Sequence, residues 1–476
     1  MNDFVVSLML LGALSSQDGV MPFWATANRY GLMPESSGGL ALLHLGSSFD
    51  ETRTLQWHWG ASAGIKSDTF GTNFIPDELY AGVRWKQLRL DAGMWRPEQQ
   101  FCAASPLLGT LSVTGGNSMM SGNARNLPGY SFTLEPWDVP FTGKHLQVFG
   151  RFGDYCTTDS RYVKGALVHN TSAFMRGNIG KHFSITAGIN HYTMWGGDSP
   201  EFGKQRITLK NYLRVLAGRS GGGDSPLGDQ INSLGDHRGN EIFRLAWKEE
   251  NWSLVYQYDK PYDDRSGMVW YNYPDGTRTF CLSFNDKTRW ISDIVYEYHT
   301  TMVQSGEYER RLATQAEIDA SDPHLYLDVE SSQWYMIVGG ADNYCNNYEY
   351  RSGWTLYGRQ LGNPLFFSRA SGMGTWNNLL TAHHFAVSGS LFRKFPYRLM
   401  LTASRNHGCW FSESGVYGKE YRFDPPLRQL STGFETELPV FGGRVSLVPA
   451  VYFDSGEALP QSFAAILSLK YNFVKS

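Results

Sequence analysis

The chain has 476 residues and a formal net charge of −3; 42% of its residues are hydrophobic, 14% aromatic and only 18% charged. The mean hydropathy is −0.35, and no apolar run approaches the roughly eighteen residues of a spanning helix, which excludes a helical membrane protein. The near-neutral charge argues against nucleic acid as a partner.

Residues 4–14 are predicted to form the first strand. Phe4, Val6, Leu8, Leu10 and Leu14 share one face if the segment is extended. The segment is long enough for the apolar part of a secretory signal, but the acidic start of the chain lacks the basic residues of such a signal. We therefore favour a strand and expect any export signal to lie upstream of this numbering.

Residues 55–66 alternate strictly between two kinds of side chain. Side chains of a strand point to opposite faces in turn. We therefore expect one set to face lipid and the other a polar interior. The expected lipid set is Leu55, Trp57, Trp59, Ala61 and Ile65, and the expected interior set is Gln56, His58, Ser62 and Lys66.

The same period recurs at residues 79–85, 88–94 and 183–190, and in a hairpin of residues 243–247 and 252–258. These half-polar strands differ from the continuous apolar strands of a parallel sheet. The period returns at residues 463–473. A closing strand that ends on an aromatic, here Phe473, resembles the carboxyl-terminal recognition signal of bacterial outer-membrane barrels, although three residues follow it.

Strands of about ten residues, aromatic at many of their ends, predict an all-β fold. We expect a transmembrane antiparallel up-and-down β-barrel of about 16 to 18 strands in the bacterial outer membrane. Long extracellular loops should fill its lumen, and the longest connections are expected at 101–127, 211–240, 306–325 and 410–427. Residues 1–476 form one domain, in which 1–38 hold the first strand and a segment able to plug the barrel. A soluble propeller or sandwich could share this composition.

Signals for catalysis or for a cofactor are absent from the sequence. The five cysteines are scattered without a metal-binding spacing. His383 and His384 are adjacent on a predicted strand and point to opposite faces, so they cannot share a metal ion. We expect no catalytic residue, no metal and no cofactor.

Six motifs in order along the chain resemble those of the Wzi-type capsule assembly family, in particular its Bacteroidetes branch. They are Pro22-Phe23-Trp24 with Ala27-Asn28-Arg29-Tyr30-Gly31; Ser121-Gly122-Asn123-Ala124-Arg125 with Pro128; Arg161-Tyr162-Val163-Lys164 with His169; Gly188, Asn190 and His191 with Trp195-Gly196-Gly197; Gly228-Asp229-Gln230-Ile231-Asn232 with Leu234-Gly235; and Asp342-Asn343-Tyr344 with Ser352-Gly353-Trp354, Gly358-Arg359 and Gly362-Asn363-Pro364-Leu365.

The resemblance implies a barrel of about eighteen strands that binds capsular polysaccharide as a lectin and anchors the capsule at the cell surface. It implies capsular or surface polysaccharide, outer-membrane lipids and the barrel-insertion machinery as partners. The best-known relatives carry a helical bundle. Here no segment before Leu42 has the helical period that would supply one.

Five residues are candidates for contacting the glycan. Trp195 precedes two glycines and Trp354 follows one, at turns where each could present an indole to a sugar ring. A loop-packing or girdle role is the common alternative. Arg125 and Arg359 could clamp glycan carboxylates, or could belong to ion pairs of the interior. His191 is expected on the polar, lumen-facing side, where it binds sugar hydroxyls or completes an interior network.

Two other functions stay open. A diffusion porin or saccharide channel would have the same barrel and polar lumen, and would differ in whether loops plug the pore. An outer-membrane hydrolase would need residues brought together from distant strands, which sequence spacing does not reveal.

Overall fold

The computed structural model describes residues 4–49, 53–223, 225–226, 229–230, 233–263, 265–306, 309–320, 325–328, 331–338, 342–414 and 418–473. Residues 228, 231, 232, 264 and 474–476, which carry parts of the sequence-based predictions, lie outside these ranges.

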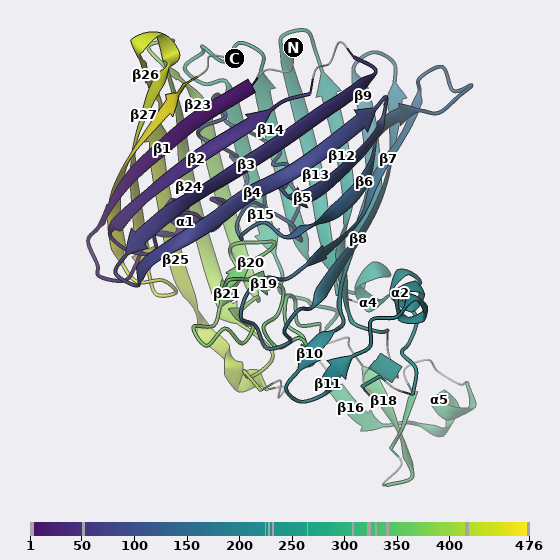
Figure 1. Ribbon diagram of the computed structural model, residues 1–476. Coiled ribbons are helices and arrows are strands. Elements are labelled where there is room, and N and C mark those ends of the chain that lie inside the picture. Colours follow the sequence, from purple (N-terminus) through teal and green to yellow (C-terminus); the bar gives the residue numbers. More distant parts are fainter. Residues whose placement is uncertain are drawn as a thin grey trace.

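Eighteen antiparallel strands close into one up-and-down barrel (Figure 1), which confirms the predicted fold class. In order around the wall they are β1 (Phe4–Ser15), β2 (Gly38–Ser47), β3 (Leu55–Asp68), β4 (Gly71–Trp85), β5 (Leu88–Met94), β6 (Pro128–Asp138), β7 (Leu146–Cys156), β8 (Leu167–Ile179), β9 (Phe183–Trp195), β12 (Asp236–Lys248), β13 (Trp252–Tyr262), β14 (Gly276–Phe284), β15 (Asp293–Thr300), β23 (Leu380–Leu391), β24 (Phe395–Gly408), β25 (Arg422–Thr436), β27 (Val445–Gly456) and β28 (Ser462–Asn472).

The wall closes where the first strand meets the last. Strand β1 pairs with β2 on one side and with β28 on the other, so that Leu8 lies opposite both Leu43 and Tyr471. The short β26 (Leu438–Val440) extends the edge of β25 and pairs with β27. Every wall strand therefore has two neighbours, which leaves no open edge in the membrane.

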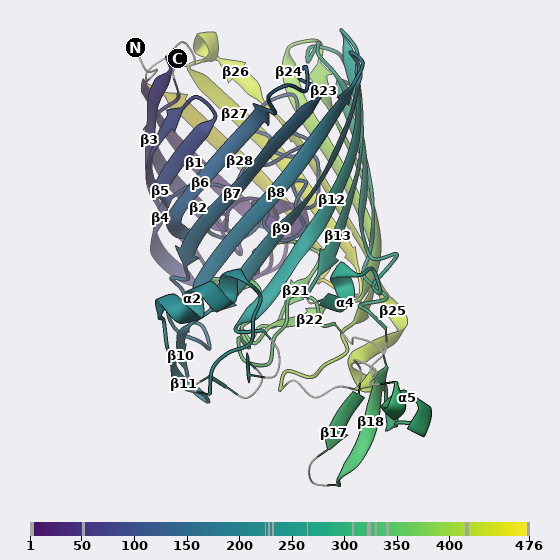
Figure 2. The ribbon, with the colours of Figure 1, turned by 90° about the vertical axis from the view of Figure 1, so that its right-hand side faces the viewer.

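The two ends of the barrel differ. Both termini and most of the short turns lie at one end, at the top of Figures 1 and 2, and the long connections lie at the other. In outer-membrane barrels the short turns are periplasmic and the long loops extracellular. The end drawn at the bottom is therefore the extracellular end.

The alternation of β3 follows the predicted faces. Leu55, Trp57 and Ile65 are at least half exposed on the outside, whereas Gln56 and Ser62 are buried inside. Large exposed aromatics gather near both ends of the wall, as the girdles of a membrane barrel require. Trp85, Trp247 and Trp290 mark the periplasmic end, and Phe70, Phe74, Tyr271 and Tyr273 the extracellular end.

The remaining elements are short, and most belong to the extracellular connections (Figure 2). The helices are α1 (Phe23–Thr26), α2 (Leu209–Leu216), α4 (Arg265–Met268) and α5 (Gln315–Asp319), with 3-10 turns η1 (Lys419–Tyr421) and η2 (Phe441–Gly443). The small strands are β10 (Gly197–Ser199), β11 (Gly203–Gln205), β16 (Glu309–Leu312), β17 (Leu325–Asp328), β18 (Gln333–Val338), β19 (Thr355–Leu356), β20 (Arg359–Gln360), β21 (Phe367–Ser368) and β22 (Thr375–Asn377). Within the part of the chain that the structure describes, no helix combines the length and apolar character needed to cross a membrane.

Candidate functional site

The connection between β5 and β6, residues 95–127, folds into the barrel, and we call it the plug. Its residues Leu108, Leu111 and Val113 are fully buried. Hydrogen bonds join the plug to β4, β9, β13, β15, β23 and β24, strands that stand on different sides of the wall. The plug therefore crosses the interior, as the prediction of lumen-filling loops requires.

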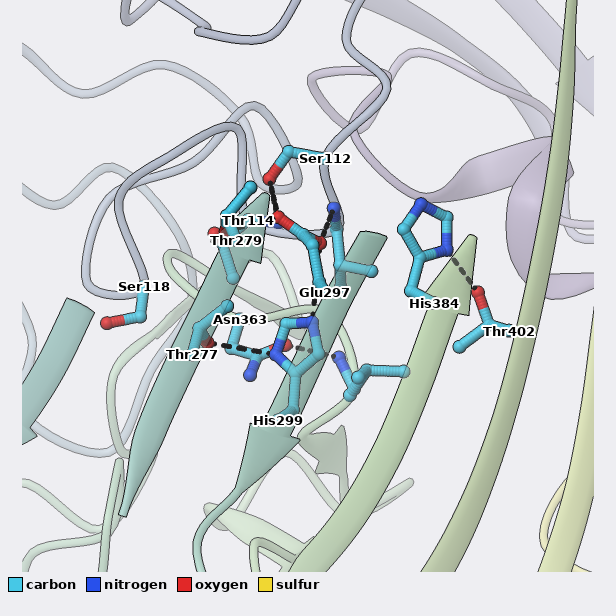
Figure 3. A network of polar contacts seen from close by, with 12 residues as sticks. Ser112, Thr114, Ser118, Thr277, Thr279, Glu297, His299, Asn363, His384 and Thr402 are labelled. Carbon is cyan, nitrogen blue, oxygen red and sulfur yellow. Dashed lines mark hydrogen bonds and ion pairs between the residues drawn. The ribbon is translucent and has the colours of Figure 1, made fainter. Parts of the chain in front are cut away.

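One anchor of the plug is Glu297, a fully buried carboxylate on β15 (Figure 3). It accepts hydrogen bonds from the Ser112 hydroxyl at 2.6 Å and from the backbone N–H of Val113 at 2.8 Å. On the wall side it accepts one from Thr279 at 3.0 Å, and His299 lies 3.3 Å away. A buried carboxylate costs free energy unless its lone pairs are satisfied, and here plug and wall satisfy them together.

A second anchor lies on β13. Asp259 accepts both the backbone N–H and the hydroxyl of Ser118, each at 2.7 Å, and Asn240 of β12 donates to it at 2.7 Å. On β23, His384 contacts the Leu111 carbonyl and the Thr402 hydroxyl, each at 2.8 Å. Polar interior residues of the wall thus serve as fixed partners for the backbone of the plug.

The connection between β1 and β2 also turns inward. The Trp24 indole N–H donates to Thr402 at 3.0 Å, and the backbone N–H of Phe23 donates to Asp454 at 2.8 Å. Farther along, Arg29 and Arg398 both pair with the buried Glu435, Arg398 at 2.6 Å. The sequence motif around Trp24 therefore serves to fill the lumen.

Two of the predicted ligand residues, Trp354 and Trp195, are buried. Trp354 is fully buried, and its indole N–H donates to the carbonyl of Met119 in the plug at 2.6 Å. Trp195 is 4% exposed and packs against Tyr212 and Val215 of α2. Both indoles occupy the packing role that was the alternative, and their ligand role stays a prediction.

The two predicted arginines hold the loops together. Arg359 forms a two-pronged ion pair with Glu35, at 2.7 and 2.9 Å, which joins the loop after β15 to the loop after β1. Arg125 donates to the carbonyl of Pro76 and lies over the ring of Tyr357, 5.2 Å from its centroid. Whether either one also binds a glycan stays a prediction.

The structure corrects the predicted orientation of His191. Its neighbours Asn190 and Tyr192 point inward, because Asn190 contacts Asn240 and Tyr192 contacts Asn117 of the plug. His191 therefore lies on the outer face, where it contacts His237 at 3.0 Å. The expectation of a lumen-facing side was wrong because the alternation that buries Asn190 inside must turn the next residue outward.

A cluster of exposed and half-buried aromatic and charged side chains lies at the extracellular end, and we call it the tyrosine platform: Tyr162, Glu201, Phe202, Tyr348 and Arg351. The guanidinium carbon of Arg351 lies 5.0 Å from the ring centroid of Tyr162 and 5.1 Å from that of Tyr348. Glu201 pairs with Arg351 and accepts from the Tyr348 hydroxyl at 3.0 Å. Two loops far apart in sequence thus present tyrosine rings around one cation, and a third loop supplies Glu201 and Phe202.

A buried pair of carboxyl groups includes Glu349, the chain neighbour of Tyr348 in the tyrosine platform. Asp229 and Glu349 interact electrostatically, and Asp229 Oδ2 has no hydrogen-bond partner among the described residues. Burial, together with repulsion from Asp229, raises the pKa of Glu349 to about 8. Glu349 therefore holds a proton at neutral pH, which reduces the repulsion between the two carboxyl groups. The Gln205 amide of β11 donates to Glu349 and joins the pair to the hairpin that carries Phe202.

The lumen also holds a cavity of about 590 Å³ between the plug and the wall formed by β1, β2, β27 and β28. Its charged lining residues include Arg29, Glu78, Arg96, Glu435 and Lys470. Lys470 and His44 lie toward the periplasmic ends of their strands, so the cavity extends toward the periplasmic side.

Searches with protein-family models and with curated protein sequences gave no match. Among solved structures, Wzi, described as an outer-membrane protein involved in group 1 capsule assembly in Escherichia coli and as a carbohydrate-binding β-barrel, is similar with a TM-score of 0.57 at 12% identity. The match covers 98% of this chain and 85% of Wzi.

Two proteins of Pseudomonas aeruginosa, the outer-membrane protein OprD and OccK9 (OpdG), are similar over 99% of this chain. OprD matches with a TM-score of 0.47 at 10% identity over 94% of its length, and OccK9 (OpdG) with 0.46 at 9% over 98%. The closed barrel and its likeness to Wzi show that this protein has the fold of an outer-membrane barrel. It is located in the bacterial outer membrane.

The tyrosine platform was not predicted from the sequence. Tyr162 stands inside one of the family-like motifs, but Glu201, Tyr348 and Arg351 carry no local signal. Arg351 and Glu201 are 150 residues apart in the sequence, and Tyr162 lies farther still from Arg351, which explains why spacing could not reveal the platform.

Proposed function

We propose that this outer-membrane barrel binds a surface or capsular polysaccharide non-covalently and helps to hold it at the cell surface. The tyrosine platform is the observation that carries the proposal. Aromatic rings offer flat apolar faces to sugar rings, and their hydroxyls and the guanidinium group offer hydrogen bonds to sugar hydroxyls. The platform lies on the extracellular loops, where a capsule would be met.

Three further observations support this function. The plug, held by Glu297 and Asp259, makes the lumen a scaffold for the loops. The family-like motifs fall on that scaffold as well, since Trp24, Arg161, Trp354 and Arg359 all hold loops in place. Wzi, which has a similar fold, is described as binding carbohydrate. The proposal includes no covalent chemistry.

Glycan binding by calorimetry tests the proposal, with capsular polysaccharide from the producing bacterium as the ligand. Tyr348→Ala should weaken binding at least about fivefold, because truncating an aromatic anchor costs more than about 1 kcal/mol. Tyr271→Ala is the matched control, since Tyr271 and Tyr348 are 58% and 57% exposed at the same end of the barrel. Equal loss in both variants, or none in either, would reject the platform as the site.

A saccharide channel is the second candidate, and the cavity of about 590 Å³ with its charged lining favours it. Such a channel needs a continuous path past the plug. Current through planar bilayers separates the two candidates, because a large steady conductance without glycan affinity would assign the protein to the channel class.

A further inference from the structure

A groove of about 630 Å³ lies on the outer surface of the barrel, across β15, β23, β24 and β25 near their extracellular ends. Tyr298, His383, Arg405 and Arg428 are among its lining residues. It is separate from the tyrosine platform, because none of the platform residues lines the groove.

Two arginines face the membrane side of this groove. Arg405 of β24 and Arg428 of β25 lie directly opposite each other in the register. Both are exposed, while their chain neighbours Ser404, Asn406 and Gln429 are buried inside. Both guanidinium groups therefore point outward.

The two arginines have no ion-pair partner among the residues that the structure describes. In the described part of the chain, neither guanidinium group forms an ion pair or a hydrogen bond, and the nearby Glu457 accepts the backbone N–H of Arg428, at 2.9 Å. Like charges directly opposite on a sheet destabilise it. A pair of this kind at a membrane interface is stabilised when an anion binds both cations.

Apolar side chains continue from the arginines toward the middle of the membrane. On β24 the outward residues below Arg405 include Leu401 and Leu399, which are 42% and 43% exposed. On β25 and β27 the strip continues with Leu430 and Phe453. The outer surface here is thus cationic at the extracellular rim and apolar beneath, which matches an amphiphile with an anionic headgroup.

We propose that this groove binds the phosphorylated headgroup of an outer-leaflet lipid, with Arg405 and Arg428 holding one phosphate between them. Guanidinium groups bind phosphate through two parallel hydrogen bonds. Tyr298 and His383, whose rings lie 5.1 Å apart, border the same groove. The acyl chains then lie along Leu401, Leu399 and Leu430.

The test is native mass spectrometry of the detergent-purified protein titrated with diphosphorylated lipid A. The arginine-pair variant, Arg405→Gln with Arg428→Gln, should bind about thirtyfold more weakly, as expected for the loss of two basic groups near a lipid surface. Arg405→Lys keeps the charge but not the paired hydrogen bonds. Its affinity for lipid A should lie between those of the unaltered protein and the arginine-pair variant. Arg393→Gln is the matched control, since Arg393 is an exposed arginine at the periplasmic end that lies near Asp286.

The outcomes decide between sources of the phosphate. Binding of lipid A without its phosphates as tightly as the diphosphorylated form would overturn the proposal. So would unchanged affinity in the arginine-pair variant, or competition by inorganic phosphate at the concentration of the lipid. Gel migration with and without heating confirms that each variant is folded before it is titrated.

Discussion

Asp259 of the wall accepts two hydrogen bonds from a single residue of the plug, the backbone N–H and the hydroxyl of Ser118, each at 2.7 Å. Ser118 lies 141 residues earlier in the chain. The bond joins the middle of the plug to β13, and Glu297 provides the equivalent bond on β15. These two carboxylates fix the plug to the wall at points separated by β14.

Removal of these anchors should open the barrel. In the double variant Asp259→Ala, Glu297→Ala, buried N–H and hydroxyl groups of the plug lose their acceptors. Each unsatisfied donor should lower the free energy of unfolding by about 1–3 kcal/mol. We expect single-channel current well above that of the unaltered protein. Tyr296→Phe, which removes only the outer-face contact to His383, is the control. If the double variant conducted no more current than the unaltered protein, this role for the two carboxylates would be contradicted.

The outer face of β28 should reject charge. Leu467 is 53% exposed on the outside near the middle of the strand, whereas the next residue, Ser468, lines the interior cavity. Leu467→Arg should destabilise the folded barrel by about 2–4 kcal/mol, because the guanidinium group meets hydrocarbon. Ser468→Arg should assemble better. Urea unfolding in lipid vesicles measures both, and the reverse order would show that the face assignment is wrong.

The aromatic end of β28 should guide assembly. Phe473 donates its backbone N–H to Val6 at 2.9 Å, and its ring lies 4.7 Å from that of Tyr471. Deleting residues 471–476 removes the end of the seam with β1 and should abolish heat-modifiable migration on gels. Deleting residues 474–476, which follow Phe473, should preserve it. Equal folding of both truncations would refute the role given to Phe473.

The carboxyl pair of Asp229 and Glu349 should make the extracellular loops sensitive to pH. The pKa of Glu349 is raised to about 8 in the folded loops, so the folded state binds more protons than the unfolded state between its ordinary value and about pH 8. The contribution of this pair to loop stability is therefore present at low pH and is lost as pH rises through that window. Glu349→Gln should remove the dependence.

Limited proteolysis of the purified barrel measures this effect. Between pH 6 and pH 9, cleavage in the loops should increase for the unaltered protein beyond the protease's own pH dependence. In Glu349→Gln it should follow the protease alone. Glu420→Gln alters an exposed carboxylate of another extracellular connection, between β24 and β25, and serves as the control. A Glu349→Gln variant that keeps the full dependence would assign the effect to another group.

The wall could be predicted from the sequence because its signal is local. Each strand repeats every two residues, and Leu55 and Gln56 already show which side faces lipid. Counting that period one residue further would also have placed His191 outside, next to Ile189 on the same face.

The interior could not be predicted in this way. The bond from Trp354 to Met119 spans 235 residues, and a tryptophan after a glycine looks the same in sequence whether it is buried or exposed. Likewise, Arg359 shows no sign in sequence that its partner is Glu35, 324 residues away. Such contacts depend on how the wall curves around the plug.

The plug contacts also constrain the order of assembly. The plug precedes most of its partners in the chain, with separations of 185 residues for Ser112 and Glu297, 273 for Leu111 and His384, and 288 for Thr110 and Arg398. It can acquire these bonds only after β15, β23 and β24 have been translocated and brought round it. Interior and wall must therefore be completed as one cooperative unit, and a chain arrested before β24 would hold a plug with nothing to bind on that side.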